Sequence, residues 1–223
     1  MNYLGTIGYR AAYMGHVPEG FMASFVAAWD HLKREIPGEY YFKRGLSCLP
    51  DQSANQLYHD FKGDWLLMLD NDHIFAQDAF EEMVTTFEAH ALDILVGFAQ
   101  KRQPPYHPAI YQTDFLEDGK VETIFPDRHE FAPIKIDSSG CYALLVRRKV
   151  FDQICDPKAF LPENDPFDKM RPDLGEDSSF FMRAKAAGFQ AWCAPWIKFH
   201  HLATVPVTDD MMVVPKIPTE FMP

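Results

Sequence analysis

The stretch WLLMLDNDHIF, residues 65–75, decides the fold, because it is an apolar run of strand length that ends on two carboxylates. From Trp65 to Leu69 there is no polar alternation, which is typical of a strand covered on both faces in a parallel sheet flanked by helices. Ligands in such sheets bind beyond the carboxyl ends of the strands. Asp70 and Asp72 are separated by one residue, so at a strand end both can turn toward one hard cation.

The same two aspartates also have a purely structural interpretation. Asp and Asn favour turns and helix N-termini, and a helical pattern follows from Asp78 to His90. These residues alone leave open whether the segment from Asp70 to Asp72 binds a ligand or only makes the turn before that helix.

Strands and helices alternate on both sides of this stretch. The apolar pattern predicts strands over residues 3–13, 39–49 and 93–100, and helices over 21–32, 51–61 and 78–91. Further along it predicts short strands in 109–115, 120–125 and 134–136, a strand entered near 138, a short helix over 149–154, a long loop over 157–172, a helix over 177–188 and a last strand over 190–199. The order β-α-β-α-β-α-β indicates an α/β sheet.

The composition is that of one large domain. With 223 residues, of which 47% are hydrophobic, the chain can bury a sizeable core, and its net charge of −11 opposes binding to nucleic acid or to anionic membranes. No stretch approaches the roughly 18 consecutive apolar residues of a transmembrane helix, and the start lacks a secretory pattern. The cysteines form no CxxC pair. We therefore expect a cytoplasmic protein with reduced thiols and no transmembrane segment.

Two further features complete a constellation with the aspartates. Gly175-Glu176-Asp177 opens a predicted helix, and His200-His201 closes the last predicted strand. In this order the motifs resemble the GT-A class of nucleotide-sugar-dependent glycosyltransferases of the family 2 type, in which an Asp-x-Asp motif follows a central strand and a Glu-Asp pair begins a later helix. The resemblance implies a GT-A (Rossmann-like) three-layer α/β/α sandwich with a mostly parallel central sheet. It implies one domain over residues 1–205, followed by an irregular tail over 206–223.

The resemblance also implies a metal site. It puts Asp72 on a divalent cation that bridges the donor diphosphate, and Asp70 on the same cation or on the donor ribose, with Asn71 as the variable middle position beside the donor. His201 completes the metal site, and His200 is the alternative if the register differs by one. Imidazole and carboxylate together suit Mn²⁺ well and Mg²⁺ less well.

The remaining site residues follow from the same resemblance. Asp177 matches the carboxylate that deprotonates the acceptor hydroxyl in inverting members, and Glu176 beside it binds the acceptor or orients the site. Gly140 matches a strand entry near donor sugar and acceptor. Asn55 matches a donor contact, although Ala54 stands where many relatives have the Arg of an Arg-Asn pair.

The expected function is therefore a metal-dependent, hexosyltransferase-like glycosyltransferase that moves a sugar from a nucleoside-diphosphate sugar to a hydroxyl acceptor. Two alternatives are a metal-dependent phosphohydrolase and a non-catalytic nucleotide-sugar-binding module of the same fold. Each motif also has an ordinary interpretation, since Glu-Asp favours the first turn of any helix and a lone His is often a hydrogen-bonded surface residue. The donor sugar and base, the acceptor, the stereochemical course and the oligomeric state are left open.

Overall fold

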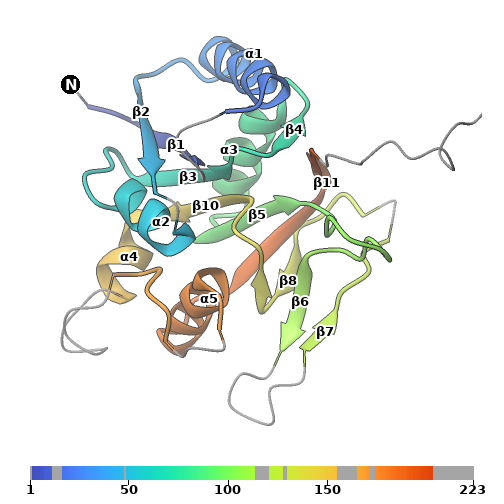
Figure 1. The fold of residues 1–223 in the computed structure, drawn as a ribbon. Coiled ribbons are helices and arrows are strands. Elements are labelled where there is room, and N and C mark those ends of the chain that lie inside the picture. Colours follow the sequence, from blue (N-terminus) through green and yellow to red (C-terminus); the bar gives the residue numbers. More distant parts are fainter. Residues whose placement is uncertain are drawn as a thin grey trace, which may run out of the picture.

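The computed structural model of the chain describes residues 2–11, 17–47, 49–113, 121–127, 130–154, 165–170 and 174–202. In this part of the chain a central sheet carries helices on both faces (Figure 1). Several features of the sequence lie outside the described residues: the connection between the strands expected in 109–115 and 120–125, most of the loop over 157–172, the tail over 206–223, and two of the four cysteines, Cys48 and Cys155. Cys141 and Cys193 are buried free thiols, and no described helix is long and apolar enough to cross a membrane.

Within the described residues, the central sheet has eight strands in the order β2-β1-β3-β10-β5-β11-β4, with β8 paired to β11. Their bounds are β1 (Gly5–Ala11), β2 (Tyr40–Leu46), β3 (Trp65–Asp70), β4 (His73–Phe75), β5 (Ile94–Phe98), β8 (Ile134–Ile136), β10 (Ala143–Arg147) and β11 (Ala191–His201). The strands β1, β2, β3, β5 and β11 point the same way, whereas β4, β8 and β10 run against them. The predicted mostly parallel α/β sheet is confirmed.

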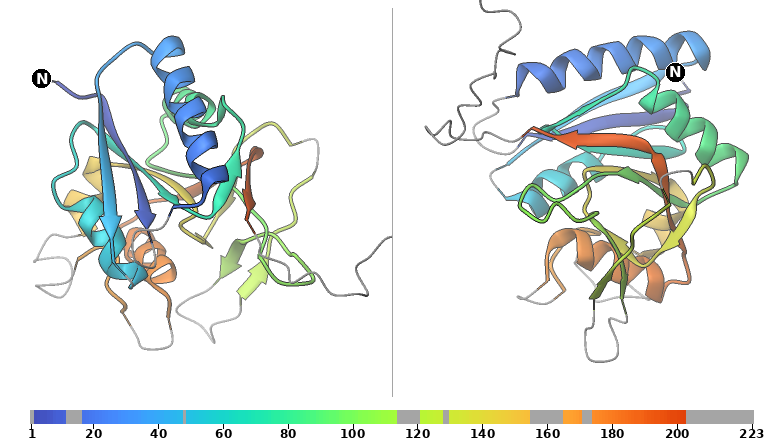
Figure 2. Two further views of the ribbon diagram at one scale, coloured as in Figure 1. Left: turned by 45° about the horizontal axis from the view of Figure 1, so that its top comes forward. Right: turned by 90° about the vertical axis from the view of Figure 1, so that its right-hand side faces the viewer.

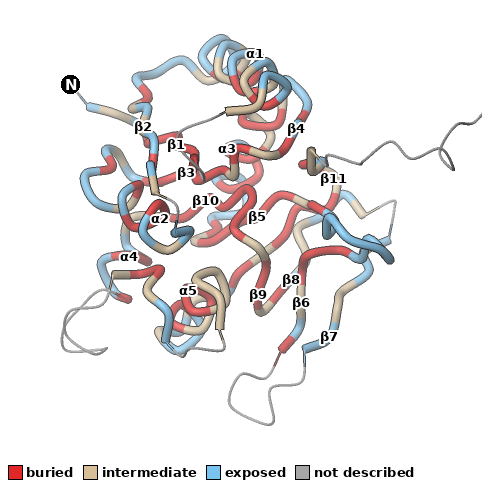
Figure 3. The backbone as a smooth tube through the Cα atoms, viewed as in Figure 1, coloured by how far each residue is buried: buried red, intermediate tan, exposed pale blue. Residues whose placement is uncertain are grey.

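Helices cover the two faces with separate apolar cores. On one face lie α1 (Glu19–Glu35) and α3 (Ala79–Ala89); on the other lie α2 (Pro50–Tyr58), α4 (Arg148–Ile154) and α5 (Glu176–Ala186), as Figure 2 shows. Helix α1 buries Phe21, Phe25, Ala28 and Leu32, the spacing of one helical face. The inner strands β1, β3, β5 and β10 are buried nearly throughout and are mostly red in Figure 3. The apolar run of β3 is buried throughout because both of its faces meet these cores.

A small antiparallel sheet follows β5. It consists of β7 (Val121–Thr123), β6 (Ile110–Thr113) and β9 (Ser138–Ser139), in that order. The short strands expected over 109–115 and 120–125 therefore form a separate sheet together with β9, whereas the one expected over 134–136 is β8 and belongs to the main sheet. Strand β9 continues into β10 through residues 140–142, which begin with Gly140.

The opening stretch, residues 65–75, folds as two strands rather than one. Strand β3 ends at Asp70, the chain turns at Asn71 and Asp72, and β4 pairs with β11 in antiparallel register. The two interpretations of the aspartates are thus compatible, since Asp72 lies in a turn that also faces the carboxyl end of the sheet. The same edge receives the end of β1, the end of β11 and the start of α5, which is where ligands of parallel sheets bind.

Candidate active site

Three side chains form a candidate cation site at the turn between β3 and β4. The register of β4 on β11 sets His73 opposite His201, and their rings lie 3.9 Å apart between centroids. Asp72 precedes His73 and completes a group whose possible ligand atoms all lie within 4.8 Å of one another. The structure brings His201 into this group, whereas His200 is exposed on the alternate position of the strand.

The chemistry of this group fits a divalent cation. Oδ1 of Asp72 lies 2.9 Å from Nδ1 of His73, but among the described residues neither atom, nor Nε2 of His73, makes a hydrogen bond of regular geometry, and buried polar atoms are rarely left so. Burial lowers the pKa of His73 to about 4, and burial together with His73 lowers the pKa of His201 to about 4. Both imidazoles are therefore neutral near pH 7, which is the form that binds metal.

The tautomer of His201 also suits a ligand. Its Nδ1 lies 2.5 Å from the backbone carbonyl of Gln100, which only accepts hydrogen bonds, so Nδ1 carries the proton and Nε2 has its lone pair free. Such an outer hydrogen bond is the usual way of orienting a metal-binding imidazole. On the other side of the group, the half-exposed guanidinium of Arg102 pairs with Oδ2 of Asp72.

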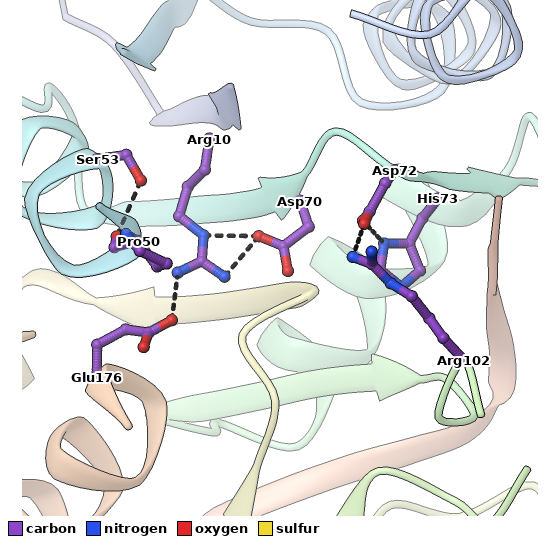
Figure 4. Close-up of polar contacts among 8 residues, drawn as sticks. All are labelled: Arg10, Pro50, Ser53, Asp70, Asp72, His73, Arg102 and Glu176. Carbon is purple, nitrogen blue, oxygen red and sulfur yellow. Dashed lines mark hydrogen bonds and ion pairs between the residues drawn. The ribbon is translucent and has the colours of Figure 1, made fainter. Parts of the chain in front are cut away.

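A second cluster surrounds Arg10, which the sequence did not single out. This residue lies near the end of β1 and is 7% exposed. Its Nη2 lies 2.5 Å from Oδ1 of Asp70, its Nε donates to the same oxygen at 2.6 Å, and its Nη1 donates to Glu176 at 3.1 Å (Figure 4). Burial opposes the charge of Arg10, but the facing carboxylates outweigh it and raise its pKa above the usual range. Arg10 therefore links the Asp-x-Asp strand to the start of α5.

Asp177 lies next to this cluster in the first turn of α5. Burial, and after it the charge of Glu176, raises the pKa of Asp177 to about 6. Its Oδ1 accepts a hydrogen bond of 2.7 Å from the backbone N–H of Ser178. A Cβ atom at Gly175 would lie 2.6 Å from Oδ1, and one at Gly140 would lie 4.0 Å from Oδ2. Gly140 is thus beside Asp177, and the absence of a side chain at Gly175 leaves room for the carboxylate.

The two asparagines predicted at the donor site have different surroundings. Asn55 is buried on α2, where its Nδ2 donates to Asp168 at 2.8 Å and its Oδ1 accepts from the N–H of Phe167 at 3.1 Å. These bonds attach α2 to residues 165–170. Asn71 is buried in the turn between the two aspartates. Donor contacts of Asn55, Asn71 and Asp70 stay predictions.

Comparison with known proteins agrees with the fold. Residues 52–155 match the family model described as glycosyl transferase family 2. None of the curated protein sequences matches the chain. The solved structure of A197 from STIV is similar over 92% of this chain and 87% of its own length, with 19% identity and a TM-score of 0.52. GalNAc-T7, solved with UDP, GalNAc and Mn²⁺, is similar over 94% of this chain, with 12% identity and a TM-score of 0.58; this chain spans 46% of it.

The resemblance to family 2-like GT-A glycosyltransferases, which the motifs indicated, is therefore confirmed. The structural likeness shows the fold, and the family match covers the Asp70–Asp72 turn and Gly140, whereas α5 and the end of β11 lie beyond it. Family and fold together support glycosyl transfer.

Proposed function

We propose that this protein is a glycosyltransferase that moves a sugar, a hexose by the resemblance, from a nucleoside-diphosphate sugar to a hydroxyl acceptor with the help of a divalent cation. The observation that carries the proposal is the partly buried, weakly acidic carboxyl of Asp177, which lies at the same sheet edge as the group formed by Asp72, His73 and His201. Sugar transfer needs both the cation group and this carboxyl. The cation neutralises charge on the departing diphosphate, and the carboxylate makes the acceptor hydroxyl nucleophilic.

In the proposed site, Asp72, His73 and His201 hold the cation, which would supply Lewis acidity toward the diphosphate. One carboxylate and two neutral imidazoles favour Mn²⁺ over Mg²⁺. The presence of Mn²⁺ with UDP in GalNAc-T7, a protein of the same fold, supports this choice. Asp70, held by Arg10, stays close enough to the turn to orient the donor ribose.

Asp177 is the proposed base. Its pKa of about 6 leaves it ionised near pH 7 yet more basic than an ordinary aspartate, which suits proton abstraction from a hydroxyl in the transition state. Glu176 is fixed through Arg10 and would position the acceptor. The small residues Gly140 and Gly175 keep space around the carboxylate.

The proposal is tested by incubating the protein with a panel of UDP- and GDP-sugars and Mn²⁺, with and without a mixture of hydroxyl acceptors, and measuring product masses. A mass gain of one sugar on an acceptor supports it. Release of phosphate or of a sugar phosphate at the same rate without acceptor identifies a phosphohydrolase instead. Nucleotide-sugar binding without any product identifies a binding module.

The cation site gives a separate prediction. We expect His201→Ala to weaken Mn²⁺ binding about 10- to 100-fold, because the variant loses a ligand whose orientation is set by Gln100. His200→Ala is the matched control, since this neighbouring histidine lies outside the group, and it should change affinity less than about threefold. Isothermal titration of metal into each variant, without nucleotide, measures both. A larger loss in His200→Ala would mean that the ligand is the other histidine.

A further inference from the structure

A cavity of about 750 Å³ lies next to the cation site and has no role in the function proposed above. It is enclosed by residues 98–108 after β5, by residues 125–127 and by the end of β11, and it meets the cation site at Arg102 and His201. Its volume is within the usual range of small-molecule sites, about 300–1,000 Å³. The structure therefore offers room for a second ligand beside the position proposed for the diphosphate.

The charge of this cavity is opposite to that of the chain. Its described lining includes three cationic side chains, Lys101, Arg102 and Lys198, but Asp127 as its one carboxylate. Three His side chains also line it, of which His201 is neutral near pH 7. The whole chain has 32 acidic and 21 basic residues. Basic lining on an acidic protein concentrates anionic ligands and repels cationic ones.

Two of these charges have no carboxylate partner among the described residues. The ammonium of Lys101 lies 5.1 Å from the ring centroid of Tyr111. That of Lys198 lies 4.2 Å from the centroid of Phe98 and donates to the carbonyl of Pro195. Burial lowers the pKa of Lys198 because it disfavours the charged ammonium. An anion bound beside Lys198 would stabilise the charged form again.

Exposed aromatic rings line the same cavity. Tyr106 is 54% exposed and Phe125 is 64% exposed, and Phe125 meets the ring of His107 edge to face at 5.1 Å. Tyr106 has a φ of +56°, an uncommon conformation for a residue with a side chain. Strained residues of this kind gather at ligand sites. The apolar C–H face of a sugar ring packs on such aromatic faces, and the ring's hydroxyls remain free for polar contacts.

We propose that this cavity is the acceptor site and that the acceptor is a saccharide with a negatively charged group. Its ring packs on Tyr106 and Phe125, and its anionic group pairs with Lys101 and Lys198. The inference rests on the proposed function, because it names the acceptor class of the same site. The cavity meets the cation site at His201, but its lining does not include Asp177. The anionic ring therefore lies in the cavity, and a neighbouring ring of the same saccharide carries the reacting hydroxyl past His201 toward Asp177.

The test measures binding alone, by titration calorimetry at low and high salt, without nucleotide or metal. The probes are two pairs matched in backbone: tri-galacturonate with its methyl ester, and a sulfated carrageenan tetrasaccharide with its desulfated, neutral form. We expect at least one acidic member to bind about tenfold more tightly than its partner, the gain of roughly one charge-assisted hydrogen bond, and this preference should shrink as salt rises.

Variants separate charge from stacking. Lys101→Gln combined with Lys198→Gln should remove the preference for the acidic member. Phe125→Ala should weaken both members of a pair by the same factor. The control is Lys135→Gln, because Lys135 also lies over an aromatic ring, 5.5 Å from the centroid of Trp192, but outside the cavity; it should change nothing.

Two results overturn the inference. One is equal affinity for the charged and neutral members of both pairs. The other is complete displacement of the acidic saccharide by UDP with Mn²⁺, which would mean that the basic residues serve the donor diphosphate. Failure of the proposed function is read separately in the donor panel, either as phosphate release without acceptor or as nucleotide-sugar binding without product for every acceptor offered, uncharged acceptors included.

Discussion

Replacing Asp177 with Asn is expected to lower the rate of sugar transfer about 10²- to 10⁴-fold, with little change in donor affinity. The amide keeps the shape of the side chain, and its oxygen can still accept the hydrogen bond from the N–H of Ser178, but it cannot take a proton. Single-turnover kinetics with saturating donor, beside a titration of the donor itself, separate the two quantities. Near wild-type transfer by the variant would exclude Asp177 as the base and would favour a retaining mechanism, in which this carboxylate only positions a substrate.

The neighbouring carboxylate provides the control for this variant. Glu176→Gln should be milder or should act on acceptor KM, because Glu176 pairs with Arg10 and does not accept the proton. The pH profile gives a further check. Since the pKa of Asp177 is about 6, kcat/KM for the wild type should rise with pH through about 6 and level off above it. The Asn variant should lose this rise.

The same substitution should make the protein more stable at neutral pH. In the folded state burial raises the pKa of Asp177 from 3.8 to about 6, so between these values the folded chain binds more protons than the unfolded chain. The contribution of Asp177 to stability therefore falls as pH increases through this window. The difference corresponds to at most about 3 kcal/mol, reduced by partial exposure, so Asp177→Asn should gain about 1–2 kcal/mol at pH 7 and nothing below about pH 4. Urea unfolding at the two pH values measures this.

Removing Arg10 is expected to have the largest effect on stability. Arg10→Met should lower the free energy of unfolding by about 3–5 kcal/mol, because it leaves the carboxylates of Asp70 and Glu176 facing each other without their buried cation. Urea denaturation at pH 7 is the measurement. Adding Glu176→Gln to Arg10→Met should recover part of the loss, since one of the uncompensated charges is then removed.

A matched surface variant shows whether burial is the reason. Glu88 pairs with Arg147 at 2.9 Å, but the Glu88 side chain is 51% exposed. Breaking this pair with Glu88→Gln should cost less than about 1 kcal/mol. An equally small loss of stability in Arg10→Met would contradict the prediction. It would mean that Asp70 and Glu176 become hydrated or protonated when Arg10 is removed, and that the ion pairs of Arg10 do not stabilise the fold.

The sequence predicted the framework of this protein better than its electrostatics. The run Trp65 to Leu69 and the apolar face of α1 are local patterns, so they could be recognised without knowing their neighbours. The pairing of β4 with β11 is a contact between residues far apart in the chain, and the register that sets His73 against His201 leaves no local trace. The sequence signal that was available for His73 is its position directly after the second aspartate.

Arg10 was recognisable in principle. It is a charged residue within the otherwise apolar and neutral β1, GTIGYRA, and a buried arginine requires carboxylate partners. Which carboxylates these are depends on the order of strands in the sheet, because β1 lies beside β3. The hydrogen bonds of Asn55 could not be read from the sequence either. The resemblance predicts a donor contact for this residue, and in the structure its amide nitrogen and oxygen bond to Asp168 and Phe167.

The turn at Asn71 gives the two aspartates of the Asp-x-Asp motif different tasks. Asp70 pairs with Arg10 in the buried network that reaches α5, and Asp72 pairs with Arg102 and His73 at the rim. One aspartate thus belongs to the scaffold and the other to the exchangeable part of the site. A substitution of Asp72 would therefore change the candidate cation site while leaving intact the ion pairs through which Arg10 joins Asp70 to the start of α5.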